Sequence, residues 1–396
     1  MTETLITPHN SAQAEEAVQW ALATRTPLAI SGSDSKCGLG HPTGCTHRLS
    51  LAQLSGIINY APNELVITLR PGTPMAELAD ALSEAGQYLA FEPPDWGPVY
   101  GQPAGGGTIG GVLSCNSSGP RRFKAGAARD HFLGVHALSG RGETFKAGGK
   151  VVKNVTGYDL CKLLAGAHGT LAMMTELTLK TLPRPAATET LILYDLEDAA
   201  GLAALRRAAR SPLELSGLAH LPAATSKSGR AETRFRAEGP PSSVRERINS
   251  LATLIGSLGE TTREDGTEAE AGWRAVGDAQ PLRDADTHLW RVALPPTDAA
   301  RVAAKSGAKR WYYDWGGGLI WLAGGDAHAI RGALGACGGH ATLFRASAAM
   351  RRQVPVFQPQ SAALAALEER VRKGFDPECI LNPGRMQPRP AAAATR

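Results

Sequence analysis

The sequence predicts an α+β fold in which an N-terminal domain is followed by an α/β cap domain with a mostly antiparallel sheet. The chain has 396 residues, and about 150 residues per domain suggests two or three domains. Pro183 and Pro185 follow a long strand pattern and mark a boundary. Beyond them, short strand and helix signals alternate, which is typical of helices that cover one face of a sheet.

The N-terminal domain, residues 1–186, combines helices and strands. Its predicted elements are a helix capped by Ser11, strands from Pro27 to Ile30 and Leu65 to Leu69, a helix from Thr73 to Gly86, a hairpin from Leu133 to Lys146 and a long strand from Met173 to Leu182. A turn rich in small hydroxyl residues, 31–38, follows the first strand.

The cap domain covers residues 187–346. Its predicted elements are a strand from Leu191 to Tyr194, helices near 197–209 and 243–257, a strand near 288–294, a hairpin in WYYDWGGGLIWL, a helix near 327–336 and a strand near 341–345. The stretch 260–286 is acid-rich and has few apolar residues, so we expect a mobile insertion there. A C-terminal segment, 347–386, contains one more helix, and a Pro/Ala tail, 387–396, is predicted to be disordered.

Composition argues against several classes of protein. The net charge of +5 is scattered, apart from a cluster at 121–124, so nucleic-acid binding has little support. The six cysteines include no C-x-x-C pair, which argues against zinc or an iron–sulfur cluster in this chain, and we expect no metal. No signal peptide or apolar run of about 18 residues is recognisable. These features predict a cytoplasmic protein with reduced thiols.

The segment Gly101 to Gly119 is the most informative part of the sequence. It holds seven glycines in nineteen residues, interleaved with Thr, Ser and Asn. Glycine lets a ligand lie directly on backbone N–H groups, and the short side chains add hydrogen bonds. A surface linker is the alternative, but Ile109, Val112 and Leu113 favour a buried loop. An extended, polyanionic cofactor is the ligand that suits such a loop.

The loop matches neither common nucleotide motif. A G-x-G-x-x-G fingerprint needs a preceding strand, a following helix and an acidic residue about 20 positions later. The glycine run is bordered by Pro103 and Pro120 instead, which disfavours a phosphate bound on a helix N-terminus. The chain also has no G-x-x-x-x-G-K-[ST] sequence. A different phosphate cradle is therefore required.

Five blocks, in this order, resemble the FAD-binding oxidoreductases of the vanillyl-alcohol oxidase and p-cresol methylhydroxylase (PCMH) type: ISGSDSK, TIGGVLSCNSSGPRR, RDHFLGV, TGYDLCKLLAGAHGTL and ILNPGR. Within that superfamily the chain looks most like the FAD-binding subunits of bacterial glycolate oxidase. The resemblance covers roughly residues 5–186 and the C-terminal segment, and KNVTGYDLCKLLAGAHGTL is its most specific part. It implies a two-lobed FAD-binding domain to which residues 347–386 return.

The resemblance implies which residues hold FAD. The pyrophosphate lies on the Gly32 to Lys36 turn and on the Gly110-Gly111 loop, where backbone N–H groups can form an anion nest. The implied FAD-binding residues are Ser31, Gly32, Ser33, Asp34, Ser35, Lys36, Gly72, Thr108, Ile109, Gly110, Gly111, Asn116, Gly119, Gly169, Thr170 and Leu171. Relatives often bond the flavin covalently through a histidine in the first loop, but this turn has none and His41 lies beyond it. We expect non-covalent FAD.

The catalytic residues are not identified by the sequence. Oxidation of a 2-hydroxy acid needs a base and cations for the carboxylate. Related catalytic subunits carry H-x-G-D-G-N-x-H, whereas the closest fragment here, Ala323 to His328, is better explained as a hairpin end that caps the next helix. The candidate residues are Arg129, His131, His168 and Arg351. His168, beside the expected flavin, is the best of them, with a local hydrogen-bonding role as its alternative.

Three functions stay open because fold alone does not determine function. In the first, the chain is the FAD-binding subunit of a glycolate oxidase (glycolate dehydrogenase) complex that oxidises glycolate to glyoxylate. A larger FAD subunit then performs most of the chemistry, an iron–sulfur subunit takes the electrons towards quinone, and the complex allows peripheral membrane association. In the second, it is a self-sufficient D-2-hydroxy-acid dehydrogenase or enolpyruvyl-sugar reductase. In the third, it is a scaffold with a vestigial flavin.

Overall fold

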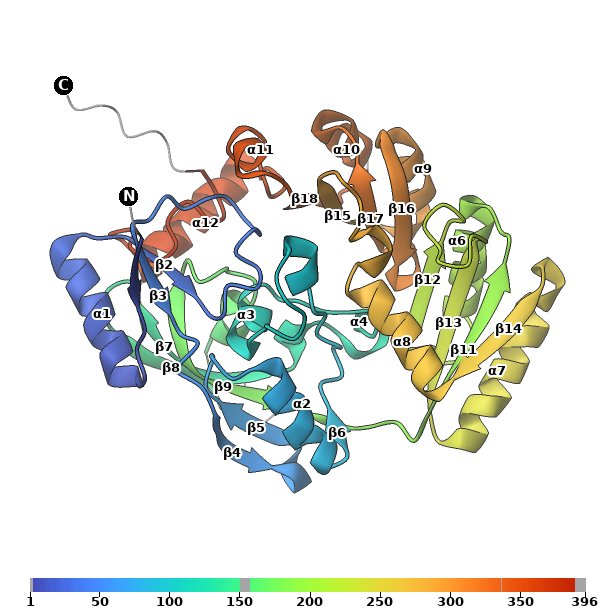
Figure 1. Ribbon diagram of the computed structural model, residues 1–396, viewed down its shortest axis with the longest axis horizontal. Coiled ribbons are helices and arrows are strands. Elements are labelled where there is room, and N and C mark those ends of the chain that lie inside the picture. Colours follow the sequence, from blue (N-terminus) through green and yellow to red (C-terminus); the bar gives the residue numbers. More distant parts are fainter. Residues whose placement is uncertain (1–2, 150–156, 336, 389–396) are drawn as a thin grey trace.

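The computed structural model describes residues 3–149, 157–335 and 337–388. It confirms the α+β class: three small or medium sheets form between residues 4 and 183, and one eight-stranded sheet forms between residues 187 and 345 (Figure 1). The segment from Lys153 to Thr156, part of the most specific sequence block, lies outside the described residues, as does most of the predicted tail, 389–396. The domain bounds 1–186, 187–346 and 347–386 stay a prediction.

A three-stranded parallel sheet begins the N-terminal domain. Its order is β1-β3-β2, with β1 at Thr4–Ile6, β3 at His47–Ser50 and β2 at Leu28–Ser31. Helix α1, Ser11–Thr24, buries one apolar face beside it. The predicted Ser11 cap is wrong by one residue, because Asn10 has the extended backbone of a cap and its side chain accepts the Gln13 N–H at 2.9 Å.

A five-stranded antiparallel sheet forms the other half of this domain. Its order is β4-β5-β9-β7-β8, with β4 at Ile57–Ala61, β5 at Val66–Leu69, β9 at Ala172–Lys180, β7 at Phe132–Ser139 and β8 at Thr144–Gly148. Helices α2, Met75–Glu84, and α5, Leu160–Leu164, pack on its core. A two-stranded ladder joins β6, Gln87–Tyr88, to β10, Leu182–Pro183. The predicted hairpin and long strand are therefore present.

The cap is built on one antiparallel sheet. Its strand order is β14-β11-β13-β12-β16-β17-β15-β18. The strands in this order are β14 at Thr261–Asp265, β11 at Ala187–Tyr194, β13 at Glu232–Gly239, β12 at Gly217–Leu221, β16 at Ala308–Asp314, β17 at Leu319–Gly324, β15 at Leu289–Ala293 and β18 at His340–Arg345. One face buries its apolar residues under α6, Asp198–Ala209, α7, Pro241–Ile255, α9, Ala299–Lys305, and α10, Ala327–Leu334. The other face packs against Trp96 and Val99 of the N-terminal domain. The cap sheet thus joins the two domains.

The structure differs from the sequence prediction at residues 260–286. This segment forms edge strand β14 and helix α8, Gly266–Gly277, rather than a mobile insertion. Ala269, Trp273 and Val276 are fully buried and lie on one helical face, and the Trp273 indole N–H donates to Thr190 at 2.9 Å. Outside this face, Glu268 is exposed and Glu270 is half-buried, so the low apolar content reflects an amphipathic helix with a narrow apolar stripe.

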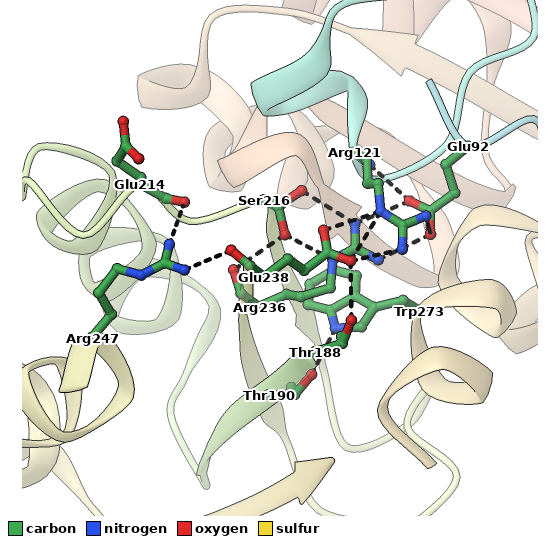
Figure 2. Close-up of polar contacts among 10 residues, drawn as sticks. All are labelled: Glu92, Arg121, Thr188, Thr190, Glu214, Ser216, Arg236, Glu238, Arg247 and Trp273. Carbon is green, nitrogen blue, oxygen red and sulfur yellow. Dashed lines mark hydrogen bonds and ion pairs between the residues drawn. The ribbon is translucent and has the colours of Figure 1, made fainter. Parts of the chain in front are cut away.

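Four charged side chains join the domains in what we call the interdomain charge cluster, formed by Glu92, Arg121, Arg236 and Glu238 (Figure 2). Arg236, from strand β13, donates to both carboxylate oxygens of Glu92 at 2.9 and 3.0 Å. Arg121 donates to Glu92 at 3.0 Å and to Glu238 at 2.7 Å. Because each charge has an opposite partner, burying the cluster is tolerated and the two domains are fixed in orientation.

Two further helices follow the cap, α11 at Ala348–Gln353 and α12 at Ala362–Phe375. After α12 the chain runs back to the parallel sheet, where the Leu28 N–H donates to the Ile380 carbonyl at 2.8 Å. Ile380 and Leu381 are buried in the core beneath α1. The last described part of the chain is thus packed against the first domain.

Candidate functional site

The first wall of the candidate site is the turn after strand β2. Asp34 has a φ of 60°, in the left-handed region, and its carbonyl accepts the Cys37 N–H at 3.1 Å. The Asp34 carboxylate pairs with Arg48 of strand β3, which anchors the turn to the sheet. The Ser31 hydroxyl is buried and has no hydrogen-bond partner in the described parts of the chain. A buried hydroxyl without a partner costs free energy, which points to a ligand at this position.

The second wall is helix α3, Ile109–Ser114, at the end of the glycine-rich run. The predicted loop at Gly110 and Gly111 is wrong, because both residues lie in the first turn of this helix, where the Thr108 hydroxyl accepts the Gly111 N–H at 3.4 Å. Ile109, Val112 and Leu113 are buried, which excludes the surface-linker alternative.

Glycines let α3 approach its neighbours closely. A Cβ on Gly32 would lie 2.3 Å from the Thr108 hydroxyl oxygen, and a Cβ on Gly110 would lie 2.7 Å from the Pro71 carbonyl oxygen. A Cβ on Gly111 would lie 3.4 Å from the Thr108 hydroxyl oxygen and 3.6 Å from the Lys36 ammonium nitrogen. The backbone of α3 and a positive charge therefore share one small space, which suits a bound anion.

The third wall is the turn between α5 and β9, where His168 has a φ of 51°. Its N–H donates to the Ser114 carbonyl at 2.9 Å, and its Nδ1 lies 3.8 Å from the Cys115 sulfur. Burial, with a smaller contribution from Arg385, lowers the pKa of His168 to about 4, so the imidazole is neutral at pH 7. Burial also raises the pKa of the Cys115 thiol, which therefore stays protonated.

The fourth wall comes from the C-terminal segment. The Asn382 side chain accepts the Ile30 N–H at 2.8 Å and donates to the carbonyls of Ile30 at 3.1 Å and His168 at 2.8 Å. Arg385 donates to the carbonyls of Cys37 and Leu39, both at 3.1 Å. This segment therefore joins the first wall to the third.

The four walls enclose a cleft of about 820 Å³, part of which is open to solvent. It lies between the three-stranded and the five-stranded sheet of the N-terminal domain, since Ser31 ends β2 while Met173 and Met174 belong to β9. Lys36 and Arg385 are the cations of the lining, and Asp34 already has a partner in Arg48. Ligand pockets in proteins typically have volumes of about 300–1,000 Å³, and the volume of this cleft lies within that range. The cleft can accommodate an extended anionic ligand.

The structure brings many of the predicted site residues together. Those that line the cleft are Ser31, Gly32, Ser33, Asp34, Ser35, Lys36, Thr108, Gly110, Gly111, His168 and Gly169. Those that do not line it are Gly72, Ile109, Asn116, Gly119, Thr170 and Leu171. The role of all of them in binding stays a prediction.

The predicted residues away from the cleft have structural contacts of their own. Neither Gly72 nor Gly119 has room for a Cβ. A Cβ on Gly72 would lie 2.1 Å from the Leu51 carbonyl oxygen, and a Cβ on Gly119 would lie 2.4 Å from the Glu92 carbonyl oxygen. The Asn116 side chain accepts the Arg129 N–H at 3.0 Å, and the Thr170 hydroxyl donates to the Ala167 carbonyl at 2.7 Å. Ile109 and Leu171 belong to the core of the antiparallel sheet.

The lining also includes residues that sequence reasoning did not assign to the site, chiefly Cys115, Met173, Met174, Asn382 and Arg385. A signal for two of them was present, because Asn382 and Arg385 belong to the ILNPGR block. The apolar residues gave no such signal, since a methionine in a strand is usually a core residue.

Two of the other catalytic candidates, His131 and Arg351, have structural roles, whereas the Arg129 side chain is exposed and does not line the cleft. His131 is buried and bonds the Ala125 carbonyl at 2.9 Å through Nε2. Arg351 donates to the Gly40 carbonyl at 2.8 Å. Asp326 caps helix α10 by accepting the Ala329 N–H at 2.8 Å, which confirms the capping interpretation of residues 323–328.

Within residues 3–149, 157–335 and 337–388, no cluster of three His, Cys, Asp or Glu side chains could hold a metal ion. Over the same ranges, every helix is too short or too polar to cross a bilayer.

Comparison with known proteins shows the family of this chain. The model of the FAD binding domain matches residues 2–148. The Escherichia coli K12 glycolate oxidase subunit GlcE is 36% identical over 377 residues, which cover 94% of this chain and 95% of that protein. The chain belongs to the GlcE family. Membership of this family makes it an FAD-dependent oxidoreductase subunit, and the chain carries an FAD-binding domain.

More distant relatives share parts of the chain or the fold. The Bacillus subtilis glycolate oxidase subunit GlcD is 32% identical over 202 residues, or 50% of this chain and 41% of that protein. The solved structure of p-cresol methylhydroxylase with bound substrate superimposes with a TM-score of 0.70 at 14% identity, covering 97% of this chain and 88% of the other. This likeness confirms the PCMH-type fold.

The cleft residues fit FAD. A diphosphate needs hydrogen-bond donors and close backbone approach. The Ser31 hydroxyl, which has no partner among the described residues, the Lys36 ammonium and the glycines of the first two walls provide them. Next to the third wall, Met173 and Met174 of strand β9 give the cleft an apolar surface that suits an aromatic ring system. When bound, FAD supplies the two-electron acceptor for oxidation of a CH–OH group.

Proposed function

We propose that this chain is the FAD-binding subunit of a complex that oxidises glycolate to glyoxylate. The similarity to GlcE over 94% of the chain supports this function, because it extends through the cap and not only through the FAD-binding domain. The observation that carries the proposal is the cleft, in which the Ser31 hydroxyl and the Lys36 ammonium face a space large enough for a dinucleotide.

We assign the pyrophosphate of FAD to the turn from Ser31 to Lys36 and to the Gly110-Gly111 turn of α3. The flavin then lies towards His168, Gly169 and the start of β9. The neutral imidazole of His168 can accept a hydrogen bond or a proton, which keeps it the candidate catalytic residue of this chain. Gly72, Ile109, Asn116, Gly119, Thr170 and Leu171 would support these walls from behind.

The flavin is proposed to be held without a covalent bond. Both ring nitrogens of His41, the nearest histidine in sequence to the first turn, are engaged: Nδ1 lies 2.7 Å from the Arg351 carbonyl oxygen, and Nε2 accepts the Val356 N–H at 3.1 Å. Precipitation with acid should therefore release all flavin into the supernatant, and yellow protein in the pellet would contradict the assignment.

A larger FAD-containing subunit and an iron–sulfur subunit are the proposed partners. The cysteines support this division, since none of them belongs to a cluster of His, Cys, Asp or Glu side chains in the described residues that could hold a metal ion. The complex is proposed to be cytoplasmic, with peripheral membrane association at most through its other subunits.

Anaerobic mixing with glycolate tests the function. The purified chain should take up FAD but keep its flavin oxidised with glycolate, and the flavin should bleach once the two partner subunits are added. Bleaching of the isolated chain would instead support a self-sufficient dehydrogenase, a class favoured by the 30% identity of an Anaerostipes hadrus D-lactate dehydrogenase over 45% of this chain. A chain that takes up no FAD would support the scaffold function, and a pull-down without an iron–sulfur protein would contradict the complex.

A further inference from the structure

A short segment that we call the strap, residues 354–358, covers the edge of the cap sheet. Strand β18 is the last strand of the eight-stranded sheet, and the strap runs along its outer side. The Leu343 N–H donates to the Val356 carbonyl at 2.8 Å, and the Ala341 N–H donates to the Gln358 side chain at 3.2 Å. Val356 is fully buried in the same core cluster as Leu343 and Ala341. The strap is therefore bound to the cap along its length.

His41 of the N-terminal domain holds the strap from the opposite side. Its side chain is buried, the Val356 N–H donates to its Nε2 at 3.1 Å, and its Nδ1 lies 2.7 Å from the Arg351 carbonyl oxygen. Because a backbone N–H can only donate, Nε2 must be unprotonated, so the neutral imidazole carries its proton on Nδ1 and donates it to Arg351. Val356 thus links the two domains through its N–H and its carbonyl.

The strap is bound unequally to the two domains. On the cap side, the guanidinium of Arg331 from helix α10 donates to the carbonyls of Pro355 and Phe357, in addition to the contacts with β18. On the side of the N-terminal domain, the strap makes one hydrogen bond among the described residues, that from Val356 to His41. Loss of this bond would leave the strap on the cap and separate it from the N-terminal domain.

Phe357 connects the strap to the FAD cleft. Its ring packs against the cap core, and its centre lies 5.1 Å from the centre of the His168 ring, with 48° between the two planes. His168 lines the cleft. Phe357 directly follows Val356, so the place of its ring depends on the bond between Val356 and His41. A change at His41 can therefore reach His168 through two adjacent residues of the strap.

The surroundings of His41 disfavour its charged form. Burial lowers the pKa of His41, the hydrogen bond to the Arg351 carbonyl opposes this effect, and the Arg351 guanidinium adds to the lowering. Arg351 and Arg385 donate to the carbonyls of Gly40 and Leu39 in the same loop. The titratable groups that act on these two arginines are Arg352, Tyr100, Cys37, Cys115 and Asp34. Asp34 is paired with Arg48, so its carboxylate is not available to His41.

We propose that His41 is a positioning residue of the FAD site: its neutral imidazole holds the strap on the N-terminal domain, and the strap holds Phe357 against His168. A proton on Nε2 would place two donors face to face, so acid separates the strap from the N-terminal domain. Once the strap has opened, the pKa of His41 returns to its ordinary value of 6.5, and opening is favoured as the pH falls below that value. The inference rests on the proposed function, because it assumes that the flavin lies towards His168.

Hydrogen exchange of the strap amides tests the release. The FAD-loaded chain is compared at about pH 7.5 and about pH 5.5, and each exchange rate is divided by the intrinsic rate of an unfolded peptide at that pH. Protection of the wild-type strap should fall about tenfold at the lower pH, which is about one unit below the ordinary pKa of histidine. The visible absorption spectrum of the bound flavin should change with the same pH dependence, because His168 lies beside it.

Three substitutions separate titration from packing. His41→Gln keeps a hydrogen-bond acceptor but cannot titrate, so strap protection should be equal at both pH values. His41→Leu removes the acceptor, so protection should be low at both, and the flavin spectrum should match that of the wild type in acid. Phe357→Leu keeps the bond to His41 and should shift the spectrum without changing strap protection. His9→Gln, which alters an exposed histidine, is the control and should behave as the wild type.

The outcomes distinguish this inference from the proposed function. Equal wild-type protection at both pH values, or a fall that persists in His41→Gln, would overturn the role of His41. A flavin spectrum that stays constant while strap protection falls would refute the coupling to His168. Thermal midpoints identify a variant that fails to fold, and His41→Gln tests the proposal even if His41→Leu is such a variant. A chain that takes up no FAD would contradict the proposed function, whereas strap exchange can still be measured on it.

Discussion

The FAD cleft and the interdomain charge cluster use similar residues in opposite ways. In the cluster, Arg236 and Arg121 are bonded to Glu92 and Glu238, and all four side chains are at most 19% exposed (Figure 2). In the cleft, the Lys36 ammonium hydrogen-bonds only to the Ser35 hydroxyl, at 3.3 Å, among the described residues, and the Ser31 hydroxyl has no partner in the same ranges.

This difference separates charged side chains that stabilise the fold from charged side chains that are available to bind a ligand. A buried ion pair contributes mainly when both partners are present, because removal of one leaves the other unpaired. A cation without a protein partner can be removed at little cost to the fold, and the loss is then seen in ligand affinity. Changes in the cluster should therefore alter stability, and changes in the cleft should alter FAD binding.

The largest effect is expected for Arg236→Met. This change leaves Glu92 and Glu238 with Arg121 alone and should lower the free energy of unfolding by about 3–5 kcal/mol, measured by urea unfolding at pH 7. Arg207→Met, an exposed arginine, is the control and should stay within about 0.5 kcal/mol of the wild type. If Arg236→Met were as stable as this control, the cluster would not join the domains as described.

Acid should weaken the cluster. Burial raises the pKa of Glu238, but Arg236 and Arg121 outweigh it and hold that pKa at about 2, below its ordinary value of 4.5. Stability from this carboxylate is thus present above pH 4.5 and is lost as the pH falls towards 2. Glu238→Gln should cost about 3 kcal/mol at pH 7, and its difference from the wild type in unfolding experiments should narrow below pH 4.5. A difference independent of pH would contradict the ion pairing.

In the cleft, Gly32→Ala should weaken FAD binding. The new Cβ would lie 2.3 Å from the Thr108 hydroxyl oxygen, so the first turn must move away from α3. We expect a loss of about 1–3 kcal/mol in FAD affinity, measured by titration of the FAD-free protein. The control is Gly256→Ala, where a Cβ meets nothing within 4 Å. Equal affinities for both variants would place the pyrophosphate elsewhere.

The smallest effect is expected for Lys36→Met. Loss of one cation near the pyrophosphate should weaken FAD binding about tenfold, while the thermal midpoint of the FAD-free protein should stay unchanged. Lys227→Met, an exposed lysine of the cap, serves as the control. A lower midpoint with unchanged affinity would remove the contrast between the two regions.

Much of the fold and part of the site could be predicted from local sequence. The turn after β2, the hairpin of β7 and β8 and the helices of the cap follow from residue periodicity and turn residues within short windows. The segment 260–286 was misjudged because its composition hid the narrow apolar stripe of Ala269, Trp273 and Val276. The loop expected at Gly110 is a helical turn because the Thr108 hydroxyl accepts the Gly111 N–H and the carbonyl of Pro71, which lies outside the segment from Gly101 to Gly119, accepts the Gly110 N–H.

The amino-acid sequence predicted that small residues in two segments admit an extended anion, because glycine has no Cβ and lets a ligand approach the backbone. Tertiary structure alone decided what closes the cleft and what fixes the cap. Asn382 reaches Ile30 across 352 residues of sequence, and Arg236 reaches Glu92 across 144. Such contacts form only when elements far apart in the sequence pack against one another. A local pattern of propensity or charge therefore does not show which distant residue a side chain will contact.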